Sequence, residues 1–271
     1  NYATPRLGIV LQPAQTQRWY ANVSRSNEAP TFWEIVNGEV PAPMNPATAV
    51  TSMSKLDLQR ALTVELGGDG TFAVAGRDLR WTVSLYRSRV EDELMSVTNA
   101  NGTPAGTYNY RGRTRHQGIE AGLSGSLPTP GDGLLDYRVA YTFSDFRFRE
   151  GEFQGNRIAG VPRHLLSAEL MYRKGGWRAG PNLRWLMSDT ETNHANAPGT
   201  QQNAYALLGF KIAYEHDAHW SAYVQADNLT DKTYASSYAI RNSATAAMPI
   251  FLPGNGRAFS AVTSSVERTL R

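Results

Sequence analysis

The sequence predicts an all-β protein whose strands form an antiparallel segment of a transmembrane β-barrel. Three observations support this prediction. Apolar and polar residues alternate in blocks of about nine to twelve residues. The polar positions mix small, aromatic and charged side chains, and the connections between blocks alternate between short and long. Gly (24) and Tyr (13) are also frequent, which suits strands joined by many turns.

Eleven blocks alternate strongly enough to be predicted as strands. In chain order they lie near residues 3–12, 19–23, 62–66, 79–85, 106–127, 137–144, 165–173, 177–185, 205–216, 220–228 and 256–268. The block at 220–228 illustrates the pattern, because Trp220 and Val224 fall on one face and Gln225 on the other.

The polar face of the predicted sheet is not uniformly charged, as a freely solvated face would be. It mixes Gly, Ser, Thr, Tyr and Asn with scattered charges, which suits a water-filled lumen. The apolar face often ends in aromatic residues such as Trp177, Trp185 and Tyr214, as membrane interfaces favour. A soluble β-sandwich, for instance a carbohydrate-binding one, also alternates and is the alternative fold.

The lengths of the connections favour the barrel. Short connections lie at 13–16, 128–133, 174–176 and 216–218, long ones at about 27–57, 97–105, 148–162, 189–202 and 229–255, and one of intermediate length at 67–78. Short turns at one end of a sheet and long loops at the other are typical of an outer-membrane barrel, whereas a Greek-key sandwich would not sort its loops in this way. We therefore predict one barrel domain over residues 1–271.

Composition excludes several functional classes. The chain has no cysteine, which excludes disulfides and thiolate metal sites, and its net charge of +3 is small and spread along the chain, so we expect no nucleic-acid partner. No run approaches the eighteen or so apolar residues of a membrane-spanning helix, and nothing resembles a signal peptide. No catalytic constellation and no metal-ligand cluster stand out, so we expect neither an enzyme nor a bound cofactor.

Five stretches spread over nearly the whole chain carry a further signal. They are "YANVSRSNEAPTFWE" (20–34), "YNYRGRTRHQGIEAGL" (108–123), "GNRIAGVPRHLLSAEL" (155–170), "QADNLTDKTY" (225–234) and "PGNGRAFSAV" (253–262). Each alone is a weak signal. Together and in this order they resemble the C-terminal half of the barrel of a TonB-dependent outer-membrane receptor.

The resemblance implies a barrel of roughly 22 strands around a plug, of which eleven are about half. It places the protein in the bacterial outer membrane, in contact with lipid and lipopolysaccharide, with the long loops extracellular and closing over a ligand. The family's plug and energy-coupling segment have no counterpart, so TonB would be reached through a missing N-terminal region. The implied function is energised uptake of a ferric siderophore or similar scarce chelate by a monomer. The alternative is a plug-less passive pore or adhesin-like barrel.

Alternation places a set of charged side chains on the lumen face. They are Arg80, Arg138, Arg163, Arg184 and Lys211, with Glu65, Glu120, Glu169, Glu215 and Asp227. The structural interpretation is that they pair with one another or meet the plug. In the functional interpretation Arg163, Arg184 and Tyr205, which lie nearest the extracellular side, guide an anionic chelate, because arginine forms forked hydrogen bonds to carboxylate or catecholate oxygens.

Three more arginines, Arg111, Arg113 and Arg115, alternate along one predicted strand and share a face with the lipid-facing Ile119. If the strand continues straight, they point outward above the membrane plane, where the phosphates of lipopolysaccharide lie. A β-bulge near "HQG" would instead turn them into the lumen. A basic rim without a specific partner is the third possibility, and the sequence leaves all three open.

Overall fold

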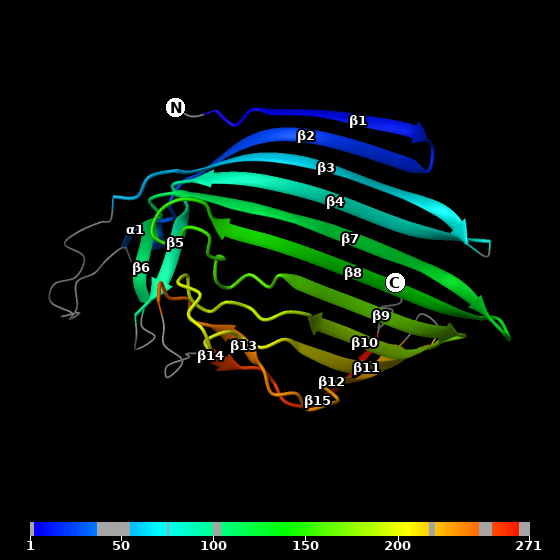
Figure 1. Ribbon diagram of the computed structural model, residues 1–271. Helices are drawn as coiled ribbons and strands as arrows, with labels where there is room; N and C mark the ends of the chain where they lie inside the picture. Colours follow the sequence, from blue (N-terminus) through cyan, green and yellow to red (C-terminus); the bar gives the residue numbers. More distant parts are fainter. Residues whose placement is uncertain are drawn as a thin grey trace, which may run out of the picture.

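In the computed structural model, eleven strands form one curved antiparallel sheet in which neighbours along the chain are also neighbours in space (Figure 1). The structure describes residues 3–36, 55–74, 76–99, 104–216, 220–243 and 251–265. In sheet order the strands are β1 (Arg6–Ala14), β2 (Gln17–Glu28), β3 (Gln59–Val74), β4 (Arg77–Glu91), β7 (Arg113–Thr129), β8 (Gly133–Phe148), β9 (His164–Lys174), β10 (Trp177–Leu186), β11 (Tyr205–His216), β12 (Trp220–Asp227) and β15 (Ala258–Ser265). The predicted fold class is confirmed, and β1 and β15 are the two edges of the open sheet.

The strand predicted at 106–127 is wrong at its beginning. Residues of β6 (Pro104–Asn109) pair with β5 (Leu94–Thr98) in a separate two-stranded sheet, and β7 joins the main sheet only at Arg113. The alternation of polar and apolar residues continues across both strands, so it could not reveal the break at Tyr110–Gly112.

The connection at 67–78, predicted to be of intermediate length, is a tight turn between Val74 and Arg77. Gly67 and Gly68 belong to β3, and aromatic rings of β2 lie over them. A Cβ atom at Gly67 would stand 2.5 Å from the ring of Tyr20, and one at Gly68 would stand 2.6 Å from the ring of Trp19. Glycine is therefore required here for a close cross-strand approach and not for a loop.

The long connections all lie at one end of the sheet and the tight turns at the other (Figure 1). The long-loop end carries the short helix α1 (Phe32–Val36), the β5–β6 hairpin, and the pair formed by β13 (Ala235–Tyr238) and β14 (Phe251–Pro253). No helix in the described ranges is long and apolar enough to cross a membrane.

The two faces of the sheet differ in chemistry. Large apolar side chains stay exposed on one face, among them Leu170 (43 %), Phe210 (38 %) and Val224 (54 %). The other face is hollow and is lined by polar residues such as Arg138 and Glu169 around a cavity of about 720 Å³. A soluble sandwich would bury its apolar face, whereas a barrel wall turns it toward lipid, so the structure fits the barrel and not the sandwich.

Cysteine labelling can check this assignment of faces. A cysteine at Val224 should resist a water-soluble thiol reagent in the membrane-embedded receptor, because we assign this position to the lipid face. A cysteine at the adjacent Gln225 faces the lumen and should react. Arginine at Val224 would cost about 2–4 kcal/mol if the position lies at the bilayer midplane. Equal labelling of the two cysteines would contradict the assignment.

Candidate functional site

The buried apolar residues of the described ranges gather at the long-loop end of the sheet, in the loops and in the strand ends next to them. Met95, Tyr110, Phe148, Phe153 and Ile158 form one cluster, and Phe148 is fully buried. We call the segments that meet around this cluster the loop cap: the described residues of 92–112, 148–163, 187–204 and 228–243. Four separate long connections of the sheet contribute to the cap.

Backbone hydrogen bonds hold the segments of the loop cap together. The amide of Thr98 donates to the carbonyl of Ile240 (2.8 Å), and the amide of Gly160 donates to that of Glu191 (2.9 Å). The amide of His194 donates to the carbonyl of Arg241 (2.8 Å). These bonds join all four connections. The long loops that we expected to close over a ligand are therefore packed against one another in this structure, apart from the loop at 27–57, of which residues 37–54 lie outside the described ranges.

His194 lies at the centre of the loop cap and is 3 % exposed. Its ring meets Phe148 edge-on, with centroids 5.1 Å apart, and its Nδ1 accepts a hydrogen bond from the amide of Ala159 (3.3 Å). Burial lowers the pKa of His194 to about 4. The ring is therefore neutral at physiological pH, with its proton on Nε2.

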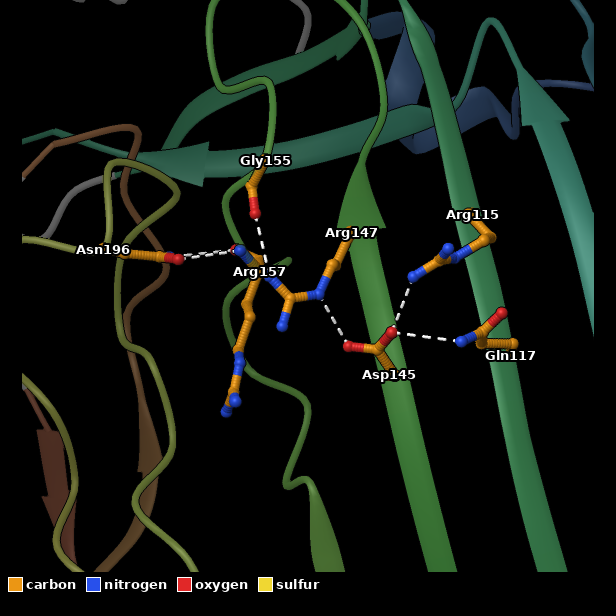
Figure 2. A network of polar contacts seen from close by, with 7 residues as sticks. All are labelled: Arg115, Gln117, Asp145, Arg147, Gly155, Arg157 and Asn196. Carbon is orange, nitrogen blue, oxygen red and sulfur yellow. Dashed lines mark hydrogen bonds and ion pairs between the residues drawn. The ribbon is translucent and has the colours of Figure 1, made fainter.

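A polar network attaches the loop cap to the strands (Figure 2). Asp145 on β8 accepts hydrogen bonds from Arg115 (2.7 Å), Gln117 (3.2 Å) and Arg147 (2.7 Å). Arg147 also donates to the carbonyl of Gly155 in the cap (2.9 Å). The cap is thus fixed to the sheet by one carboxylate shared between two strands.

The lumen face has a second hollow of about 430 Å³ around Arg184, and its lining includes Arg138, Glu169 and Lys211. The ammonium of Lys211 lies 4.4 Å from the centroid of the Tyr223 ring. Arg138, Glu169 and Arg184 form no ion pair with any residue that the structure describes. The unpaired guanidinium groups leave this hollow open to an anion.

Two other lumen charges are satisfied, but by residues outside the set that we expected to pair. Glu215 binds Arg178 (3.2 Å), and Glu65 accepts hydrogen bonds from Tyr20 (2.8 Å) and Asn22 (3.1 Å). Sequence reasoning could not separate these satisfied groups from the unpaired ones around Arg184, because pairing depends on cross-strand register.

The structure does not bring Arg163 together with Arg184. The Arg163 guanidinium lies 5.5 Å from the centroid of the Phe143 ring. Phe143 lies on the outward face of β8, because it pairs with the outward-facing Ile119 of β7. The lumen placement expected for Arg163 is therefore wrong. The reason is that β9 begins at His164, so Arg163 precedes the strand and strand alternation does not apply to it.

Tyr205 is the first residue of β11 and is 8 % exposed. Its ring packs against Tyr234, with centroids 4.8 Å apart. The register places Tyr205 opposite Leu186, two residues from Arg184. Of the three residues expected to guide a chelate, Arg184 and Tyr205 are thus near neighbours, and Tyr205 is largely covered.

The pairing of β7 decides how Arg113 and Arg115 point. Its register with β4 and with β8 is continuous from one end to the other. The β-bulge that would have turned these arginines into the lumen is therefore contradicted, and both share the outward face with Ile119. Arg111 precedes β7, is exposed, and forms no ion pair within the described ranges.

No group of three or more metal-ligating side chains gathers among the residues that the structure describes. The sequential antiparallel strands, the exposed apolar face and the polar hollow face define a segment of an outer-membrane β-barrel wall. Residues 1–229 match the family model for the TonB dependent receptor-like β-barrel. The chain belongs to this family and is part of the barrel of a TonB-dependent receptor of the bacterial outer membrane.

Comparisons with individual proteins agree with this assignment. The chain is 25 % identical over 270 residues to the probable TonB-dependent receptor BfrD of Bordetella pertussis, covering 93 % of this chain and 33 % of that protein. The ferric yersiniabactin uptake receptor FyuA of Yersinia pestis shares the fold (TM-score 0.68, 16 % identity), over 96 % of this chain and 36 % of FyuA. The copper transporter OprC also shares it (TM-score 0.70, 16 % identity), over 96 % of this chain and 38 % of OprC. The chain thus spans about a third of the length of the curated relative.

Proposed function

We propose that the receptor containing this chain takes up a ferric siderophore or a similar scarce, anionic metal chelate across the outer membrane, with energy supplied through TonB. The observation that carries the proposal is the hollow around Arg184 on the lumen face of a chain that belongs to the receptor family. This interpretation is preferred over a passive pore because the family is one of energy-coupled receptors.

The chemistry of the hollow suits an anion. Its cations include Arg138, Arg184 and Lys211, and its lining contributes one carboxylate, from Glu169. Its volume of about 430 Å³ lies within the range of roughly 300–1,000 Å³ that small-molecule sites occupy. Unpaired guanidinium groups form forked, charge-assisted hydrogen bonds to carboxylate or catecholate oxygens.

Similar structures support a metal-containing cargo without choosing one. FyuA is described as a ferric yersiniabactin uptake receptor and OprC as a copper transporter. A metal carried by an anionic ligand is compatible with both descriptions. The proposal therefore names the chemical class of the cargo, an anionic chelate, and leaves the metal to experiment.

The test measures binding and uptake of a radiolabelled ferric tris-catecholate by the complete receptor. We expect Arg184→Ala to weaken binding by about ten- to a hundredfold, because one charge-assisted hydrogen bond contributes about 1.5–3 kcal/mol. Arg163→Ala is the matched control and should bind normally, because its guanidinium lies over Phe143.

Uptake by the unmodified receptor should stop in cells that lack TonB. Unchanged binding by Arg184→Ala would assign this arginine a scaffolding role. Uptake that continues without TonB would favour the passive pore. A ferric hydroxamate and a copper chelate, measured in parallel, would identify the class of chelate.

A further inference from the structure

The outward face of β7 changes from apolar to basic at one level. Its outward positions from Ile119 to Leu127 are apolar or small, and the next ones toward the loop cap are Gln117, Arg115 and Arg113. The rise from Ile119 to Leu127 is about 27 Å along the strand, or about 21 Å across the membrane at a tilt of about 40°. Since the apolar band of such barrels is about 25 Å tall, the arginines lie at the level of the lipid headgroups.

The neighbouring strand β4 repeats this change at the same level. Its outward Leu85 is 44 % exposed and is followed on the same face by Arg87 and Arg89. In the register, Leu85 lies opposite Ile119 and Arg89 lies opposite Arg115. The transition from aliphatic to basic side chains is therefore a shared feature of two paired strands.

These side chains surround a hollow of about 270 Å³. We call its basic lining the arginine patch: Arg87, Arg89, Arg113, Arg115 and Arg149. The patch is only partly neutralised. Arg89 pairs with Glu91 (2.7 Å), Arg113 with Glu150, and Arg115 with Asp145, which also binds Arg147.

Two members of the arginine patch, Arg87 and Arg149, are exposed and form no ion pair with a described residue. Arg115 has the opposite role. Its guanidinium is held by Asp145 at 2.7 Å, and Gln117 and Arg147 bind the same carboxylate (Figure 2). The patch thus combines a fixed arginine with two unsatisfied ones, an arrangement suited to an anion with several oxygens.

We propose that the arginine patch binds the phosphate groups of a phosphorylated glycolipid in the outer leaflet of the membrane. The patch continues the lipid-facing surface upward, so an acyl chain of the same molecule would lie along Leu85 and Ile119. Arginine binds phosphate through forked hydrogen bonds. Both parts of the lipid then have a matching surface on β4 and β7.

The experiment titrates the complete, detergent-folded receptor with bisphosphorylated lipid A and, separately, with dephosphorylated lipid A. The test variant is Arg87→Gln with Arg149→Gln, which removes two unpaired charges and breaks no ion pair within the described residues. The control is Arg77→Gln with Arg80→Gln, which removes two charges from the other end of β4. We expect about a tenfold or greater loss of affinity for the phosphorylated lipid in the test variant.

The control variant should bind the phosphorylated lipid with the affinity of the unmodified receptor. Dephosphorylated lipid A should bind the unmodified receptor weakly, with about the affinity that the test variant has for the phosphorylated lipid. Inorganic phosphate at millimolar concentration should not displace the lipid, because it lacks the acyl chains. The proposal is overturned if both lipids bind equally, if test and control variants behave alike, or if inorganic phosphate alone competes.

Discussion

Phe148→Ala should open the loop cap and destabilise it by about 3–5 kcal/mol, the cost typical of truncating a buried phenylalanine. Phe148 is fully buried, and its ring contacts Tyr110 (4.6 Å between centroids), Phe153 (5.3 Å) and His194 (5.1 Å). These partners come from three different connections of the sheet. Removing the ring would leave a cavity where the connections meet, while the hydrogen bonds of the barrel wall are unaffected.

Amide hydrogen exchange on the folded receptor measures this effect. The amide of Ile158 donates to the carbonyl of Phe146 (3.0 Å), and that of Gly155 donates to the carbonyl of Phe148 (2.9 Å). Both should exchange about two to four orders of magnitude faster in the variant. Phe251→Ala is the control, because Phe251 is 50 % exposed and its truncation leaves no buried cavity. Equal exchange in the two variants would show that Phe148 does not hold the loop cap together.

The barrel wall could be predicted from the sequence because the face of each strand residue follows from its immediate neighbours in the sequence. In β12, Val224 and Gln225 differ in character because one faces lipid and the other the lumen, and every strand repeats this contrast. Eleven strands and their order followed directly. The glycines at 67–70 were assigned to a connection because the aromatic residues that lie over Gly67 and Gly68 come from a different strand, which local composition does not reveal.

The loop cap could not be predicted, because its contacts join residues that are far apart in sequence. Thr98 meets Ile240, and Tyr108 donates a hydrogen bond to Asn242 (2.8 Å). Taken one at a time, the sequences of these loops are polar and aromatic and show no periodic pattern of apolar residues. The placement of Arg163 failed for a related reason, since the pattern does not show that β9 begins one residue later. Arg113 and Arg115 were ambiguous only until the register excluded a bulge.

The two proposed binding functions depend on different faces of the sheet. On the lumen face, the unpaired cations around Arg184 would bind a soluble anion. On the outward face of β4 and β7, the unpaired cations of the arginine patch would bind the phosphate groups of a lipid. A change at one face should leave the other intact, because each strand residue reaches only one side of the wall. Arg184→Ala and the Arg87/Arg149 double variant should thus show independent losses of chelate and lipid affinity.

Acidification should loosen the loop cap through His194. Its pKa is lowered by burial to about 4, whereas an unfolded histidine has a pKa of about 6.5. Between these two values the opened cap binds a proton that the closed cap excludes. The stabilising contribution is therefore complete above pH 6.5 and is lost progressively as the pH falls from 6.5 to about 4. A difference of roughly 2.5 pH units corresponds to about 3 kcal/mol.

Hydrogen exchange of the Ala159 amide reports this loss directly, because that amide donates to Nδ1 of His194 (3.3 Å), the atom that would take up the proton. After correction for the intrinsic pH dependence of exchange, its protection should fall by about a hundredfold between pH 7 and pH 4. His194→Gln is the control, since glutamine does not titrate in this range and its protection should not depend on pH, whatever its starting value. The charge of Glu93 opposes the lowering of the His194 pKa. In a Glu93→Gln variant the midpoint pH of the loss of protection should therefore move lower. Protection that is equally pH-dependent in His194→Gln would show that another group controls the opening of the cap.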